Sequence, residues 1–212
     1  MYKRGDESMR IDTVHDMQQV YRTLLQSMAR PGSVASLQPI TSKMDDAKGC
    51  YKTTWLIAMT LLDAEVTFHI LGDPQGEVTS KISAYTFAQF TSIEKADYIF
   101  VLEDTSETEI IHDLSQCKIG DLRDPQLSAT WIIENKLNQN PDQWSLTGPG
   151  IKGETKLPLL LTEEFLQARK GRTNEHPLGI DLIFTTKNAE IVCLPRTTSI
   201  HRKGEANWAM SQ

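Results

Sequence analysis

Hydrophobic residues near the start of the chain recur with the period of an α-helix. Between Val14 and Met28 they stand at positions 14, 17, 20, 21, 24, 25 and 28. Spacings of three and four residues place these side chains on one face, so the pattern predicts an amphipathic helix. Asp12 or Thr13 can cap this helix, and Pro31-Gly32 ends it.

Three more helices and three strands are expected before the chain midpoint or shortly after it. The helices are expected over 50–62, 77–84 and 107–116, and the strands over 34–37, 66–71 and 98–102. The helix over 50–62 is apolar nearly all round from Trp55, which predicts a buried position. Tyr98 to Leu102 is a continuous apolar run, which is typical of a strand covered on both faces.

Polar turns divide the C-terminal half into two expected hairpins. Residues 127–133 and 143–147 flank Asn-Gln-Asn-Pro-Asp, and residues 180–185 and 189–194 flank Thr-Lys-Asn. A charged helix over 162–171, capped by Thr162, is expected between the hairpins. Because helices and strands interleave before the hairpins, we expect one α/β domain with a mixed sheet.

The composition indicates an ordinary globular protein of a reducing compartment. The chain has 212 residues, of which 39% are hydrophobic, enough for a core that needs no metal or disulfide. Its three cysteines, Cys50, Cys117 and Cys193, are widely spaced and form no C-x-x-C motif. The basic N-terminus precedes no apolar run, and Trp55 to Leu62 is far shorter than the ~20 residues that span a bilayer. We therefore expect a soluble, cytoplasmic protein that does not enter a membrane.

Charge and motifs exclude several function classes. The 22 Lys and Arg against 28 Asp and Glu give a net charge of −6, which does not support nucleic-acid binding. The sequence contains no phosphate-binding G-x-x-x-x-G-K-[ST], no G-x-G-x-x-G after a strand and no G-x-S-x-G. Its five histidines lack the spacing of metal ligands, so we expect no metal site and assign no catalytic residue.

Three loops carry the candidate chemistry, and each has a structural alternative. Arg30, at a helix end before Pro31, could bind phosphate or could simply lie near the negative end of the helix dipole. Gly148 and Gly150 could bring backbone N–H groups close to an anion, or could form a tight turn. Arg196 and Thr197, which are followed by a second hydroxyl, resemble a phosphate clamp.

The alternative for Arg196 is an ion pair with a carboxylate of the neighbouring strand, such as Asp181. Asp181 and Asp63 are the acids with the most apolar neighbours, and either could have a pKa perturbed by burial. Neither has a second carboxylate or a histidine at a spacing suited to acid–base chemistry. A structural role is therefore favoured for both.

Six segments in order resemble the PhnH family, a subunit of the bacterial carbon–phosphorus lyase system. The resemblance is carried by Val20 to Gly32, Leu61 to Ile70, Ala96-Asp97-Tyr98, Leu146 to Ile151, Pro177 to Phe184 and Leu194 to Thr198. It predicts a family domain over 12–200, with a flexible N-terminal tail (1–11) and a C-terminal tail (201–212). Its implied fold is a mixed central sheet flanked by helices, similar to the large domain of pyridoxal-phosphate transferases without the cofactor.

The resemblance also implies a function. Members of this family form homodimers and join PhnG, PhnI and PhnJ subunits in a complex that handles ATP and alkylphosphonates. In its early step an alkylphosphonate displaces adenine from ATP, giving alpha-D-ribose 1-alkylphosphonate 5-triphosphate. The radical chemistry belongs to the PhnJ subunit, so no cofactor is expected on this chain, and the lack of a cysteine cluster agrees with that division.

Three hypotheses follow from these observations. The chain is a subunit without catalytic activity of its own, or an enzyme whose Arg30, Arg196 and 148–150 loop bind phosphate or phosphonate at one concavity. The third hypothesis, an independent pyridoxal-phosphate enzyme, rests on fold analogy alone, and no lysine stands out as a Schiff-base partner. We favour the first.

Overall fold

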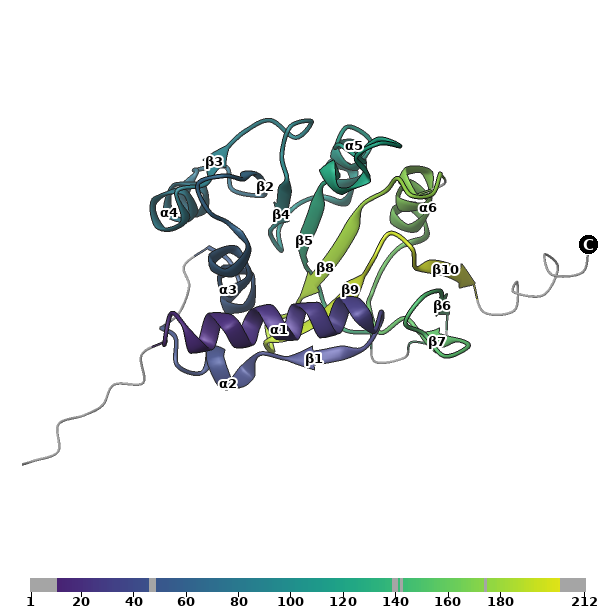
Figure 1. Ribbon diagram of the computed structural model, residues 1–212, viewed down its shortest axis with the longest axis horizontal. Helices are drawn as coiled ribbons and strands as arrows, with labels where there is room; N and C mark the ends of the chain where they lie inside the picture. The colour runs from purple at the N-terminus through teal and green to yellow at the C-terminus, as the bar shows by residue number, and fades with distance from the viewer. Residues whose placement is uncertain (1–10, 46–48, 139–140, 142, 174, 203–212) are drawn as a thin grey trace, which may run out of the picture.

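Seven strands form the central sheet in the order β1-β9-β8-β5-β4-β2-β3 (Figure 1). The computed structural model of the protein describes residues 11–45, 49–138, 141, 143–173 and 175–202. The strands of this sheet are β1 (Val34–Ser36), β2 (Thr67–Leu71), β3 (Gln89–Phe90), β4 (Tyr98–Val101), β5 (Thr130–Glu134), β8 (Asp181–Thr185) and β9 (Glu190–Leu194). The five strands from β3 to β8 are parallel, whereas β9 pairs antiparallel with β8 and β1.

Helices cover both faces of this mixed sheet, as expected for a single α/β domain. One face carries α1 (His15–Ala29), α2 (Gln38–Thr41), α3 (Lys52–Leu61) and α4 (Glu77–Thr86). The other carries α5 (Glu107–Leu114) and α6 (Glu163–Arg172). Side chains of a strand alternate between the faces, so Trp131 and Ile133 pack in one core and Ile132 in the other. A single 3-10 turn, η1 (Pro125–Leu127), precedes β5.

A second, three-stranded antiparallel sheet packs below the α6 side of the domain (Figure 1). Its strands are β6 (Trp144–Thr147), β7 (Thr155–Lys156) and β10 (Ser199–Arg202), in the order β10-β6-β7. Leu146 of β6 is fully buried and belongs to the same core as β5 and β8. This sheet therefore extends one hydrophobic core and does not enclose a separate one.

The prediction that residues 127–133 and 143–147 form a hairpin is wrong. β5 lies between β4 and β8 in the large sheet and is parallel to both, whereas β6 pairs with β7 and β10 in the small sheet. Trp131, Ile132 and Ile133 are all buried, because β5 is covered on both faces. A strand covered in this way gains most by pairing at the centre of a parallel sheet.

The other strong patterns are confirmed. The helix expected over 14–28 is α1, and Asp12 Oδ1 accepts the N–H groups of Val14 and His15 at its start. Thr162 Oγ1 accepts the Phe165 N–H at the start of α6, and β8 and β9 form the expected hairpin.

The two expected tails fall mostly on residues 1–10 and 203–212, outside the described residues, while positions 201 and 202 are in β10. In the part of the chain that is described, no helix combines the length and apolar character needed to cross a bilayer.

Candidate functional site

The three loops singled out in the sequence meet at one place in the fold. A Cβ atom added to Gly150 would clash with the carbonyl oxygen of Ala29, at the end of α1. A Cβ atom added to Gly148 would lie 2.8 Å from the carbonyl oxygen of Thr197, in the turn after β9. The 148–150 turn therefore packs between the end of α1, next to Arg30, and the turn that contains Thr197. The backbones of all three candidate anion-binding loops converge.

The Arg196 side chain is held within the fold. Its Nη2 lies 2.6 Å from Asp181 Oδ2 and 2.5 Å from Ser128 Oγ, and its Nη1 donates to the carbonyl oxygen of Pro125 at 2.6 Å. This is the arrangement that the sequence offered as the alternative to a phosphate clamp. Arg30 and Thr197 are exposed, and among the described residues no side chain pairs with the Arg30 guanidinium.

A second location stands out from the topology of the sheet. The chain passes from β2 through α4 on one face, and from β4 through α5 on the other. Strands β2 and β4 are parallel neighbours, so their carboxyl ends form a topological switch point, where α/β sheets bind ligands. A cavity of about 270 Å³ opens there, and Gly72 and Leu102, the residues after β2 and β4, line it.

The buried carboxylate of Glu134 lines this cavity. Glu134 is the last residue of the central strand β5 and is 7% exposed. Its Oε1 accepts the Tyr51 N–H at 2.6 Å, and its Oε2 accepts the Glu103 N–H at 3.0 Å. Burial away from water raises the pKa of Glu134 above its ordinary value, despite these two donors. Glu134 is therefore suited to hold a proton inside the cavity.

A second carboxylate at the same cavity, that of Glu103, has a pKa that is shifted in the opposite direction. Lys187 Nζ lies 2.6 Å from Glu103 Oε2, and this hydrogen bond lowers the pKa of Glu103. Two neighbouring carboxyl groups whose pKa values are pushed apart can serve as proton donor and acceptor. Burial raises the pKa of the Tyr51 phenol, whose ring lies 5.6 Å from the Lys187 ammonium. The phenol therefore stays neutral at physiological pH.

Cys50 lies beside this site but is not an activated nucleophile. It lines the switch-point cavity and a neighbouring cavity of about 520 Å³. Burial raises the pKa of the Cys50 thiol to about 12, so the thiolate required for nucleophilic attack is scarce near pH 7.

Sequence reasoning missed Glu134 and Glu103 and chose other acids. Asp63 is exposed and accepts the Glu65 N–H, and Asp181 pairs with Arg196. The available signal was an acidic residue directly after an apolar run, since such a residue ends a buried strand at the carboxyl edge. Among the described residues, no group of three or more His, Cys, Asp and Glu side chains is arranged to hold a metal ion.

The comparisons with known proteins agree with one another. The family described as "Bacterial phosphonate metabolism protein (PhnH)" matches residues 10–201. A protein of Stutzerimonas stutzeri named putative C-P lyase subunit protein HtxG is 27% identical over 207 residues, covering 94% of this chain and 93% of its own length. The PhnH subunit of alpha-D-ribose 1-methylphosphonate 5-triphosphate synthase from Rhizobium meliloti (strain 1021) is 27% identical over 197 residues, with 91% and 94% covered. Because the family match spans nearly the whole described chain, this protein belongs to the PhnH family of bacterial phosphonate metabolism.

Proposed function

We propose that this chain is a subunit of a carbon–phosphorus lyase complex. In that role it supports the step in which an alkylphosphonate displaces adenine from ATP to give alpha-D-ribose 1-alkylphosphonate 5-triphosphate. The observation that carries the proposal is the match along nearly the full length to two proteins that are themselves named subunits. A stand-alone phosphonate-binding enzyme is less well supported, because neither relative is named as one.

The cavities of the described chain fit a supporting role. The cavity next to Tyr51 and Lys52 has a volume of about 520 Å³ and the switch-point cavity about 270 Å³. The first lies in the lower half of the range for sites that enclose a drug-sized ligand, and the second lies below that range. The reaction brings together ATP and a phosphonate. We therefore expect a site for both substrates to be completed by other subunits, and the chain alone to be inactive.

The proposed partners are a second copy of this chain and subunits of the PhnG, PhnI and PhnJ types, in the cytoplasm. Three exposed aromatic residues near the β3 edge of the sheet favour such contacts: Tyr85, Phe87 and Phe90 are 66%, 74% and 50% exposed. Aromatic residues are enriched in the cores of protein interfaces, and a short edge strand is open on one side. The likeness to the large domain of pyridoxal-phosphate transferases stays a prediction.

The test is reconstitution. The chain is co-expressed with the other subunits of the complex, and adenine release from ATP and methylphosphonate is measured with and without it. We expect the chain to co-purify and adenine release to fall when it is omitted. Adenine release by the purified chain alone would contradict the supporting role, and failure to co-purify would contradict membership of the complex.

A further inference from the structure

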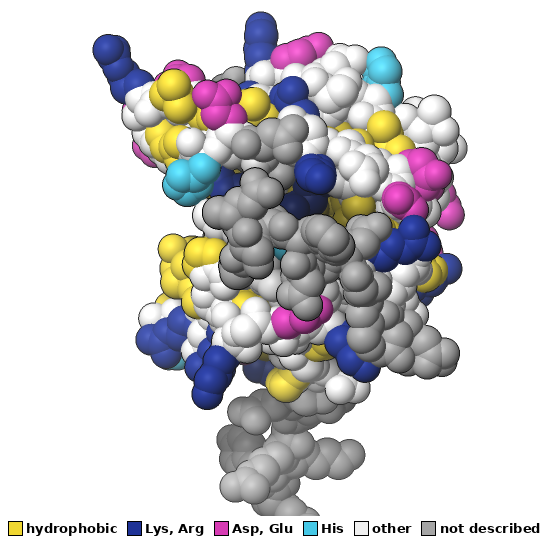
Figure 2. Space-filling model, turned by 90° about the vertical axis from the view of Figure 1, so that its right-hand side faces the viewer, with side chains coloured by type: hydrophobic (Ala, Val, Ile, Leu, Met, Phe, Trp, Pro, Cys, Tyr) yellow, Lys and Arg dark blue, Asp and Glu magenta, His cyan; other side chains and the backbone are white. Residues whose placement is uncertain are grey.

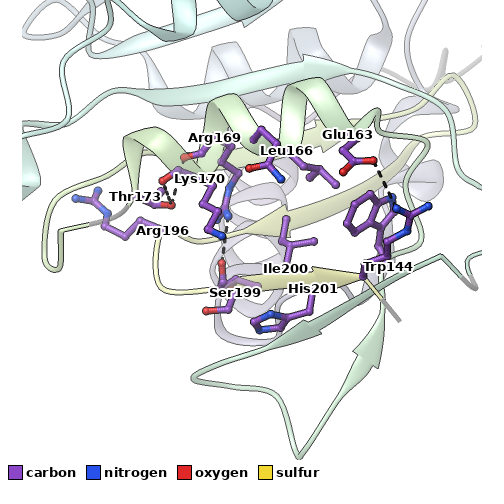
Figure 3. A pocket seen from close by; sticks show the side chains of 13 residues that line it. Trp144, Glu163, Leu166, Arg169, Lys170, Thr173, Arg196, Ser199, Ile200 and His201 are labelled. Carbon is purple, nitrogen blue, oxygen red and sulfur yellow. Dashed lines mark hydrogen bonds and ion pairs between the residues drawn. The ribbon is translucent and has the colours of Figure 1, made fainter. Parts of the chain in front are cut away.

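A cavity of about 320 Å³ lies between α6, the segment after β9, and β10 (Figure 3). Arg169 and Lys170 reach it from α6, Thr198 and Ser199 from the turn and β10, and Trp144 from β6. In Figure 3 the Arg169 side chain extends from the helix toward the start of β10, where Ser199 lies. None of the loops of Arg30 and Gly148–Gly150 lines this cavity.

Arg169 is a buried cation that has no counterion among the described residues. It is 3% exposed, and its Nη1 and Nη2 donate to the carbonyl oxygens of Thr198 (3.1 Å) and Pro195 (2.8 Å), which are uncharged. No described carboxylate forms an ion pair with it, and Asp181, whose charge favours the protonated form, is already bound to Arg196. Burial lowers the pKa of Arg169 to about 10, so the guanidinium is still charged at pH 7. A buried charge that lacks a partner is costly.

Three buried polar atoms of residues that line the cavity also lack hydrogen bonds to the described part of the chain. Arg169 Nε, Trp144 Nε1 and Thr198 Oγ1 are buried and have no partner in the described part of the chain. Most buried polar side-chain atoms in proteins are paired, so three such atoms around one cavity require an explanation. Two of them are donors and the third is a hydroxyl that can donate, which is the set that an oxyanion would satisfy.

The remaining charges around the cavity are mostly positive. Lys170 is exposed and pairs with no described residue, and Arg202 and Arg196 also line the cavity. Glu163 is the one acidic residue among the described residues that line the cavity, and its Oε2 lies 3.8 Å from Arg202 Nη1. Figure 2 shows the face on the right-hand side of Figure 1, where both basic and acidic side chains are scattered over the surface. With a net charge of −6, attraction of an anion must come from such local groups.

We propose that this cavity binds a small phosphate-type oxyanion, either inorganic phosphate or the phosphonate or phosphate group of a small molecule. The anion would compensate the Arg169 charge, with Lys170 at the rim and the Thr198 and Trp144 groups supplying hydrogen bonds after small adjustments. Charge-assisted hydrogen bonds from guanidinium and ammonium groups are the strongest means of holding such an anion. The inference does not depend on the proposed function.

The test measures binding to the full chain by thermal shift and by the NMR signals of ¹⁵N-labelled tryptophan indoles. The probes are inorganic phosphate, methylphosphonate and ATP, with potassium chloride and acetate at equal ionic strength. We expect at least one of the three probes to raise the melting temperature above both controls, since a ligand of the native state stabilises it. The Trp144 indole signal should move, and that of the fully buried Trp131 should not. The response to ATP relative to the two small anions distinguishes a nucleotide source from a free oxyanion.

Anion binding by four single-residue variants tests whether the ligand occupies this cavity. Lys170→Ala removes a side chain without described partners, and we expect it to weaken binding about threefold or more without unfolding the protein. Arg169→Gln should abolish the Trp144 shift. Lys95→Ala, which alters an exposed lysine that does not line the cavity, and Arg30→Ala should both bind as the wild type does. The proposal is overturned if no probe exceeds chloride, or if Arg30→Ala loses binding while Lys170→Ala keeps it.

Discussion

Asp181 and Arg196 hold the β8–β9 hairpin together at its open end. Asp181 begins β8, Arg196 follows β9 by two residues, and Asp181 Oδ1 also accepts the Arg196 backbone N–H at 2.8 Å. Their side chains are 22% and 18% exposed, so the pair is largely shielded from water. The guanidinium also reaches Ser128 and Pro125, which fastens the hairpin to the segment that precedes β5.

Replacing this guanidinium should therefore destabilise the fold. We expect Arg196→Ala to lower the free energy of unfolding by about 2–4 kcal/mol, because it leaves Asp181 largely buried and without its cation. Arg196→Lys should recover only part of this loss, since a lysine cannot donate to Asp181, Ser128 and Pro125 together. Urea unfolding measures both variants, with Lys95→Ala as the control. A loss below about 0.5 kcal/mol for Arg196→Ala, typical of an exposed surface site, would show that the pair is not structural.

The raised pKa of Glu134 predicts how the stability of the fold depends on pH. Its pKa is raised in the folded state above the ordinary value of 4.5, so the folded state holds the proton more tightly than the unfolded state. The stability linked to this group is fully present below pH 4.5 and is lost as pH rises through the folded pKa. Glu134→Gln removes this titration and leaves one of the two backbone N–H donors without an acceptor, which costs about 1–3 kcal/mol.

The wild type should therefore be more stable than Glu134→Gln by a margin that shrinks as the pH is raised from 4 toward 8. Urea unfolding of both proteins across that range measures the margin. A margin independent of pH would mean that the Glu134 carboxyl titrates alike in both states. Glu65→Gln, an exposed site, serves as the control.

Gly150 and Gly153 allow a controlled comparison, because they share a backbone conformation but differ in their surroundings. Both have positive φ, 82° and 76°, but a Cβ atom on Gly150 would clash with the Ala29 backbone, and one on Gly153 would meet nothing within 4 Å. Gly153→Ala should cost about 1–2 kcal/mol, the strain of the left-handed conformation alone. We expect Gly150→Ala to cost at least about 2 kcal/mol more, because the turn must move away from α1. Equal losses of stability in thermal unfolding would show that the turn at Gly150 is not tightly packed against the end of α1.

The aromatic residues near the β3 edge can be tested without disturbing the fold. Phe87 is 74% exposed and has a φ of 63°, a conformation that asparagine tolerates better than most residues. We expect Phe87→Asn to keep the melting temperature but to reduce self-association or co-purification with the other subunits. Leu122→Asn, at an exposed residue of a separate loop, is the control. Unchanged assembly of Phe87→Asn would remove this surface as a contact.

The predictions from sequence succeeded where the signal is local. The periodicity of α1, the Thr162 cap and the short turn between β8 and β9 are each written within a few adjacent residues. The pairing of β5 was predicted incorrectly because tertiary packing decides which strands become neighbours. The two neighbours of β5 are β4 and β8, and long segments of chain separate both of them from β5. The pairing of Arg196 with Asp181 could be foreseen because Asp181 begins the partner strand of the hairpin and Arg196 closely follows the end of β9.

The chemistry at the switch point could not be predicted in the same way. Glu134 acquires its properties from Tyr51 and Glu103, which come from two other segments of the chain. Arg169 looks like an ordinary residue of a charged surface helix, and only the fold places it at 3% exposure beneath the turn after β9. Burial of this kind depends on which elements pack together, and residue spacing does not encode it.

The position of β1 has a consequence for the order in which the chain folds during synthesis. Val34 is paired with Val192, and among the described strands β1 is hydrogen-bonded to β9 alone. β1 is therefore synthesised long before the strand that it pairs with. Closing so long a loop is entropically expensive and slow compared with forming the local β2–β4 pairing. The nascent chain keeps the apolar stripe of α1 uncovered by β9 until β9 has been synthesised, which makes that interval an aggregation-prone stage.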